Sequence, residues 1–126
     1  MRQPVTSHAA PAAIGPYSQA VAVGRLLFTS GQIPLDPATG QLVEGDIAAQ
    51  TRRVFRNLLA VCAAANLNFT HVARVGIYLV DLADFAEVNK VMAEFFNSPY
   101  PARSTIGVAS LPKGARVEID LVLSLD

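Results

Sequence analysis

Several residue types are scarce in this sequence, and each scarcity excludes a class of chemistry. The single cysteine in 126 residues cannot form an internal disulfide, which suits a reducing compartment. The two histidines, His8 and His71, stand at no spacing from cysteines or carboxylates that resembles a metal site. The sequence has neither a glycine-rich phosphate loop nor a Gly-x-Ser-x-Gly turn. We therefore expect no metal ion, and no chemistry of the common nucleotide-binding or serine-hydrolase type.

Charge is also scarce, and it is balanced. Ten basic and ten acidic residues give a formal net charge of zero, and charged residues make up 16% of the chain, against roughly 25% in typical soluble domains. There is no tryptophan and no basic stripe, which disfavours nucleic acid as a partner. A small domain with so little charge leaves more apolar surface than a monomer hides easily, so we expect self-association.

The sequence also lacks the segments that direct a chain into or across a membrane. Its N-terminus has no basic region followed by an apolar core, and no apolar run approaches the roughly 18 residues of a membrane span. These absences favour a cytoplasmic protein with no membrane partner. With 52% hydrophobic residues, the 126 residues suffice for a core, and we expect one domain that spans 1–126.

Hydrophobic periodicity predicts strands in both halves of the chain. Two short strands with apolar residues flank Gly24-Arg25, a dipeptide typical of a tight hairpin. Further strands are predicted over 72–80, 103–109 and 115–124, with another short one near the start. In the last strand the apolar residues share one face and leave Glu118 on the other.

Two helices are predicted between these strands, which gives an α+β fold. The first begins at Asp46, a favourable N-cap, and ends near Asn66. The second begins at Asp84, which forms a capping-box pattern with Glu87, and ends near Asn97. The order β-β-α-β-α-β-β is typical of a mixed sheet with both helices on one face. The opposite face mixes polar and apolar residues, as expected if it meets partner subunits.

Arg103 and Glu118 are the charged residues that the strand pattern explains least. Arg103 is either a surface or interface arginine, or a planar fork that grips a carboxylate through two parallel hydrogen bonds. Glu118 is either a sheet-face carboxylate paired with Arg116 or with a partner-chain arginine, or an acid in an apolar cleft. In the cleft its pKa would be raised, which would let it exchange protons near neutral pH.

Five other residues carry weaker signals. Tyr17, in GPYSQA, is by itself most simply a packing residue whose hydroxyl is hydrogen-bonded. Ser30 and Gly31 end a strand, where glycine allows a ligand to approach the backbone. Asn89 is a polar, solvated position of the second helix, and Cys62 belongs to the apolar stripe of the first.

Taken together, four segments resemble one family. GPYSQA, SGQIP, PARS and LPKGARVEI occur in the order and spacing of the reactive intermediate deaminases, the Rid or YjgF family, and the resemblance covers nearly the whole chain. It implies a chorismate-mutase-like fold whose last strand lies inside the sheet. It also implies a homotrimer with three clefts between its subunits.

The resemblance implies an activity as well. Members of the RidA type hydrolyse 2-imino acids, such as 2-iminobutanoate, 2-iminopropanoate and its enamine tautomer 2-aminoacrylate, to 2-oxo acids and ammonia without a cofactor. These reactive acids are released by pyridoxal-phosphate-dependent dehydratases, so their removal protects pyridoxal-phosphate enzymes. The small-molecule partner expected for this chain is therefore a 2-imino acid.

Residue roles follow from the same resemblance. Arg103 matches the arginine that holds the substrate carboxylate, and Glu118 matches the acid that positions or activates water. Tyr17, Ser30 and Gly31 match residues of the same cleft, and Asn89 matches one nearby. The backbone of residue 105 matches the point that contacts the substrate nitrogen. Many members carry cysteine at this position, whereas this chain has Thr105.

Two other functions stay open at this point. One is a ribonuclease or translation inhibitor, an activity also attributed to family members, which the neutral charge and lack of tryptophan disfavour. The other is a trimer that binds a small ligand without turning it over. A related alternative is a pathway-specific paralogue, for example one that acts on aminoacrylate from pyrimidine breakdown.

Overall fold

One mixed sheet organises the chain, in a computed structural model that describes residues 1–126. Its six strands lie in the order β1-β2-β3-β6-β4-β5, and every neighbouring pair is antiparallel except β4 and β5. The bounds of the strands are β1 Gln3–Val5, β2 Ala20–Val23, β3 Leu26–Thr29, β4 Val72–Leu79, β5 Ala102–Gly107 and β6 Val117–Ser124. The last strand therefore lies between β3 and β4, which confirms that it does not form a hairpin with its predecessor.

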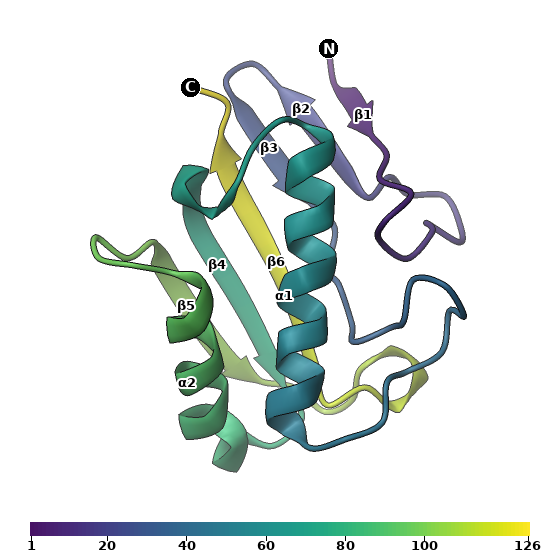
Figure 1. Cartoon of the computed structure of the whole chain (residues 1–126), viewed down its shortest axis with the longest axis vertical. Helices are drawn as coiled ribbons and strands as arrows, with labels where there is room; N and C mark the ends of the chain where they lie inside the picture. The colour runs from purple at the N-terminus through teal and green to yellow at the C-terminus, as the bar shows by residue number, and fades with distance from the viewer.

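Both helices cover the same face of the sheet (Figure 1). Helix α1, Ile47–Ala64, joins β3 to β4, and α2, Phe85–Phe95, joins β4 to β5. Since each helix connects two strands that run in the same direction, each must cross over one face of the sheet. This arrangement confirms the predicted α+β class, with two helices on one face of a mixed sheet.

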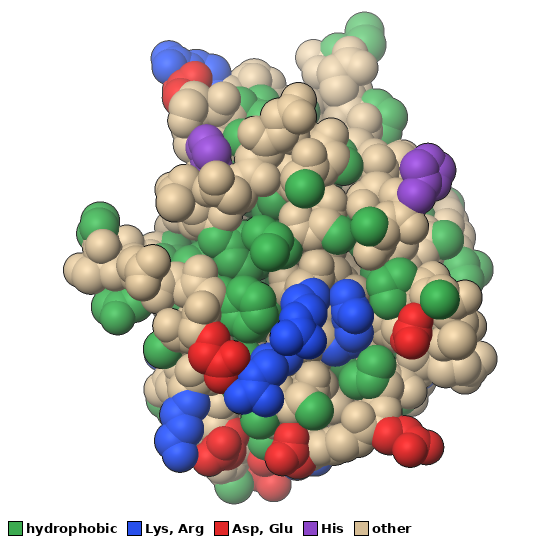
Figure 2. Space-filling model, viewed as in Figure 1, with side chains coloured by type: hydrophobic (Ala, Val, Ile, Leu, Met, Phe, Trp, Pro, Cys, Tyr) green, Lys and Arg blue, Asp and Glu red, His purple; other side chains and the backbone are tan.

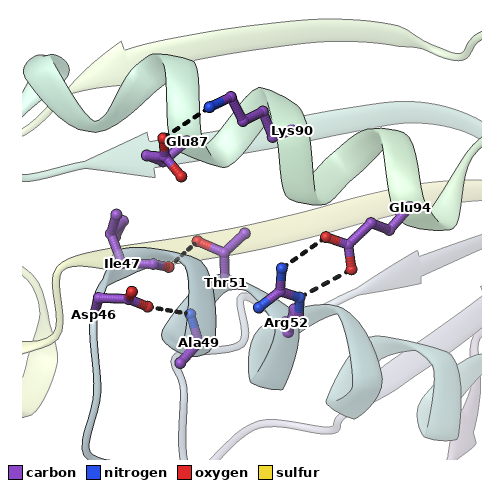
Figure 3. Close-up of polar contacts among 8 residues, drawn as sticks. All are labelled: Asp46, Ile47, Ala49, Thr51, Arg52, Glu87, Lys90 and Glu94. Atoms are coloured by element: carbon purple, nitrogen blue, oxygen red, sulfur yellow. Dashed lines mark hydrogen bonds and ion pairs between the residues drawn. The ribbon is translucent and has the colours of Figure 1, made fainter.

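The ends of α1 agree with the prediction. The carboxylate of Asp46 accepts a hydrogen bond from Ala49 N–H at 2.9 Å (Figure 3). At the other end, Asn66 adopts a φ of 61°, a left-handed conformation that asparagine tolerates better than most residues. The chain leaves the helix there.

The start of α2 differs from the prediction. Asp84 makes no side-chain capping bond; instead, Asp81 accepts from Ala83 N–H and starts a 3₁₀ turn, Leu82–Asp84, that leads into α2. The carboxylate of Asp84 is engaged elsewhere, since Arg116 donates to it at 3.1 and 3.2 Å. The capping-box interpretation was therefore wrong: a tertiary ion pair holds the carboxylate.

The core lies between the helices and the sheet. One cluster of 23 buried residues fills this layer and includes Val54, Phe55 and Leu58 of α1. From β4 and β6 it receives side chains that are at most 1% exposed: Val75, Ile77, Leu79, Val117, Ile119, Leu121 and Leu123. The alternation of β4 also predicted Ala73 on this face, but Ala73 is exposed, because the register with β6 shifts between Val72 and Arg74. Cys62 is completely buried in this cluster, as predicted. The opposite face of the sheet carries no helix.

Arginines gather on the outer surface of α1. Figure 2 shows Lys and Arg side chains over this helix, with Asp and Glu side chains beside them. Arg52 forms a two-pronged ion pair with Glu94 of α2, at 2.9 and 2.8 Å (Figure 3), and Arg53 donates to Asn57 at 3.0 Å. This cluster was missed in the sequence because its charges cancel in the overall balance.

Candidate functional site

Arg103 lies on the helix-covered face of the edge strand β5. In the parallel register it stands opposite Val75, which is buried in the core. Its Nη1 donates to Asn89 Oδ1 at 2.5 Å, and its guanidinium lies 5.2 Å from the centre of the Phe85 ring. Both partners belong to α2. No carboxylate of the chain forms an ion pair with Arg103, so most of its donors remain free.

A shallow pocket of about 410 Å³ surrounds this guanidinium, and we call it the Arg103 pocket. Its lining residues come from α2 and from the segment that enters β5: Asn89, Met92, Ala93, Tyr100, Pro101 and Arg103. A planar cation held at one nitrogen by an amide and stacked on an aromatic ring is oriented before a ligand arrives. The pocket is therefore suited to a small carboxylate. Asn89 was expected to be solvated, but its side chain instead orients Arg103.

Glu118 lies on the opposite face of the sheet. It pairs with Tyr78 across β4 and β6, while its neighbours Val117 and Ile119 point into the core. Its side chain extends over Gly31: a Cβ added to that glycine would lie 2.7 Å from Glu118 Cδ. Only glycine, which has no Cβ, leaves room at position 31 for the side chain of Glu118.

The carboxyl of Glu118 lines a groove of about 560 Å³, which we call the Glu118 groove. Its lining residues are Pro11, Ala12, Ile14, Tyr17, Ser30, Gly31, Gln32, Ile33, Leu35, Pro112, Lys113 and Glu118. Burial raises the pKa of Glu118 above its usual value, and the negative charge of Asp120 raises it further. Of the alternatives left open for Glu118, pairing with Arg116 is excluded, since that arginine pairs with Asp84.

Hydrogen bonds to main-chain groups hold the walls of the groove. Ser30 Oγ donates to Ser18 O at 2.6 Å, and Ser30 N–H donates to Gln19 O at 2.9 Å. The amide of Gln19 is 3% exposed; it accepts from Ser7 N–H at 2.6 Å and donates to Pro11 O at 2.7 Å. The hydrogen bonds of Ser30 and Gln19 therefore hold the N-terminal segment in place along the groove. Gln19 directly precedes β2, and the sequence pattern did not mark it.

Tyr17 lies on the rim of the same groove. Its side chain is 51% exposed, and its hydroxyl makes no hydrogen bond within the chain. It is therefore not the packed, hydrogen-bonded tyrosine that its position alone suggested. An exposed ring with a free hydroxyl can contact a ligand or a second chain.

Thr105 follows Arg103 on the same face of β5. Its hydroxyl oxygen is buried and has no hydrogen-bond partner. Val108 N–H donates to Leu79 O at 2.9 Å, and successive residues of a strand direct their main-chain groups to alternate sides. The N–H and C=O of Thr105 therefore point away from β4, at the free edge of the sheet.

The predicted site residues thus form two separate groups. Arg103, Asn89 and Thr105 belong to the helix-covered side of β5, whereas Glu118 belongs with Tyr17, Ser30 and Gly31 on the open side. No three His, Cys, Asp or Glu side chains come together as a metal site would require. None of the helices is long and apolar enough to span a membrane.

Known proteins resemble this chain in both sequence and fold. A family model described as Endoribonuclease L-PSP matches residues 7–124. A crystal structure of RidA from the Antarctic bacterium Psychrobacter sp. PAMC 21119 superimposes with a TM-score of 0.93 at 45% identity, over 97% of this chain and 98% of that one. The chain belongs to the RidA family. The resemblance noted in the sequence is thereby confirmed.

Relatives within the RidA family have different names. Protein DfrA of Myxococcus xanthus is 54% identical over 123 residues, which are 96% of this chain and 94% of that protein. A protein of Bos taurus named 2-iminobutanoate/2-iminopropanoate deaminase is 45% identical over 122 residues, 97% of this chain and 89% of its own. Membership of the family therefore supports an imine deaminase, in a family whose members have more than one role.

Proposed function

We propose that this protein hydrolyses 2-imino acids to 2-oxo acids and ammonia, in clefts that two copies of the chain form together. The observation that supports this most is the pair of half-sites: a free, oriented arginine at one sheet edge and a carboxyl of raised pKa in a groove on the other face. The deaminase name of relatives such as the Bos taurus protein favours the same reaction.

The assembly that this requires is a homotrimer of single, chorismate-mutase-like domains, as the sequence resemblance implies. The open face of the sheet supports it, because it exposes Val23, Leu26, Phe28 and Ile106 to 41–48%. Apolar side chains gathered on a sheet face without helices are expected to be covered by another copy. The proposed location is the cytoplasm, where pyridoxal-phosphate enzymes release such imines.

In the proposed reaction, Arg103 binds the substrate carboxylate through two parallel hydrogen bonds. Water held by Glu118 attacks the carbon of the protonated imine; a C–O bond forms, and the C=N π electrons move to nitrogen. Glu118 takes a proton from this water and returns it to the nitrogen. The C–N bond then breaks, the hydroxyl gives its proton to the Glu118 carboxylate, and the departing ammonia takes that proton and leaves as ammonium, which gives the 2-oxo acid. The imine is already electrophilic, so orientation supplies much of the acceleration.

The test couples a threonine dehydratase, which releases 2-iminobutanoate, to trapping of the imine by semicarbazide. The wild-type protein is expected to suppress semicarbazone formation. Arg103→Ala, which loses two charge-assisted hydrogen bonds, is expected to reduce kcat/KM at least about a hundredfold. If a folded wild-type protein leaves the imine untouched, the proposal is wrong for this substrate.

A second arm of the same test uses RNA, because the matching family model is described as an endoribonuclease. Single-stranded RNA is incubated with the same protein preparations at matched concentration. We expect no cleavage that depends on Arg103 or Glu118. Cleavage by the wild type that both variants lose, without imine hydrolysis, would replace the deaminase proposal with a ribonuclease.

A further inference from the structure

A polar cluster occupies the centre of the open sheet face, beside Glu118. Gly76 of β4 leaves a gap there, and three side chains gather over it. The point where a Cβ of Gly76 would stand lies 3.1 Å from Arg74 Nη1 and 3.2 Å from Tyr78 Oη, and closest to Asp120. Gly76 and Asp120 are direct cross-strand partners. The glycine thus lets polar groups of β4 and β6 meet above the sheet.

Tyr78 fixes Asp120 within this cluster. Its hydroxyl donates to Asp120 Oδ2 at 3.0 Å, and both side chains are partly buried. Arg74 forms no ion pair with Asp120. The negative charge of Asp120 is therefore held in one position but is not neutralised by a salt bridge within the chain.

Asp120 lies two residues after Glu118 on the same face of β6. Two residues of a strand span about 7 Å. At that spacing, in a half-buried site, a negative charge on one carboxyl favours the protonated form of the other. Tyr78 adjoins both carboxyls, since it is the cross-strand partner of Glu118 and the hydrogen-bond donor to Asp120.

Outside this cluster, the charged or titratable groups near Glu118 either bind other partners or lie at the rim of the Glu118 groove. Lys113, from the turn before β6, donates to Gly40 O at 3.3 Å. Arg116 is paired with Asp84, and Tyr17 stands at the rim of the groove. Asp120 is therefore the carboxylate placed to act on Glu118, and the electrostatic contribution to its raised pKa has the same source.

We propose that Asp120, held in place by Tyr78, is a positioning residue that makes Glu118 a stronger base for the proton that it takes from water and passes to the nitrogen. This inference rests on the proposed function, in which Glu118 exchanges a proton with water and nitrogen. Asp120 does not line the Glu118 groove, so it acts through its charge. Two like charges so close favour the neutral form of the more buried carboxyl.

The test measures Glu118 directly and then the reaction. The side-chain carboxyl of Glu118 is titrated by ¹³C NMR in the assembled protein, with Glu118→Gln assigning the signal. Asp120→Asn keeps an acceptor for Tyr78 but removes the charge, so the titration midpoint of Glu118 should fall measurably below that of the wild type. Tyr78→Phe should lower it less, and Asp120→Glu should leave it close to the wild type. Glu94→Gln removes one charge on the helix-covered side and should change nothing.

The pH profile of kcat/KM for imine hydrolysis supplies the second readout. Its limb assigned to Glu118 should move with the NMR midpoint in Asp120→Asn, a change that simple loss of packing would not produce. An unchanged Glu118 midpoint in Asp120→Asn overturns the inference, and so does a midpoint that falls while the profile stays fixed. If no variant hydrolyses imines at all, the proposed function fails, whereas the NMR titration still decides whether Asp120 controls Glu118.

Discussion

Arg103 and Glu118 lie on opposite faces of one sheet, on strands separated only by β4. Arg103 stands beside Val75 on the face that α2 covers, and Glu118 stands beside Tyr78 on the open face. A single chain therefore cannot present both groups to one small substrate. If both act in one reaction, the second group must come from another copy, which makes assembly part of the chemistry.

Asn89→Ala is predicted to weaken substrate binding without unfolding the protein. The variant loses the 2.5 Å hydrogen bond that orients Arg103, worth about 1 kcal/mol, so KM should rise several-fold while kcat changes less. Steady-state kinetics of imine hydrolysis measure this. Lys90→Ala, one residue further along α2 and exposed, is the matched control and should keep the wild-type KM. Equal effects of both variants would contradict an orienting role for Asn89.

Gly31→Ala is predicted to displace the Glu118 carboxyl. The added Cβ would lie 2.7 Å from Cδ and 3.0 Å from Cγ of Glu118, closer than such contacts allow. Activity should fall more than about tenfold, with Tm reduced by a few degrees. Gly107→Ala is the control, because its Cβ meets only the flexible Leu82 side chain at 3.2 Å. A Gly31→Ala protein with wild-type kinetics would show that Glu118 does not act from its observed position.

Glu118→Gln is predicted to change how stability depends on pH. Burial, and secondarily Asp120, raise the pKa of Glu118 above its usual value of 4.5 in the folded protein. The folded state then binds this proton more tightly than the unfolded state does. The free energy of unfolding therefore decreases as pH rises from near 4.5 through the raised pKa, and the loss persists above it.

The Glu118→Gln variant has no carboxyl at this position, so its free energy of unfolding does not decrease for this reason as pH rises. Its midpoint of urea unfolding, measured from pH 4 to pH 8, should decline less with pH than that of the wild type. Glu87→Gln, an exposed carboxylate on α2, serves as the control and should follow the wild-type curve. A steeper decline in Glu118→Gln would contradict the direction of the pKa shift.

Cys62 is predicted to be unreactive in the folded protein. The thiol is completely buried in the core, and burial raises its pKa to about 12. Thiolate is the reactive form, so a disulfide reagent such as DTNB at pH 8 should release about one equivalent of chromophore only after denaturation. With Thr105 at the position where many relatives carry cysteine, the folded protein then has no thiol available for oxidation. Rapid reaction of the native protein would contradict the buried placement.

Local patterns predicted most of the fold. The helix bounds near Asp46 and Asn66 follow from capping chemistry and apolar period, and they are confirmed. The cap of α2 was wrong because Arg116, distant in sequence, takes the carboxylate of Asp84. A local sequence pattern cannot predict that a residue distant in sequence will bind the carboxylate that would otherwise cap the helix.

The site was harder to predict than the fold. Motifs selected Arg103 and Glu118, but the faces on which they lie follow from the register of β5 and β6 on β4. The hydrogen bonds between Gln19 and Ser7 and between Tyr78 and Asp120 could not be predicted either, because these residues are distant in sequence and meet only in the folded chain. Residue types therefore suggested the proposed chemistry, and tertiary geometry placed each group on its face of the sheet.

Mixing two inactive variants tests the central claim most directly. Arg103→Ala and Glu118→Ala proteins are unfolded together, refolded at equal concentration and assayed for imine hydrolysis, with each variant refolded alone as the control. In a trimer with clefts between subunits, random assembly gives roughly a quarter of the clefts an intact Arg103 from one chain and an intact Glu118 from the next. The account predicts recovery of about a quarter of the wild-type activity. A mixture as inactive as the separate variants, although it assembles normally, would contradict a site shared between chains.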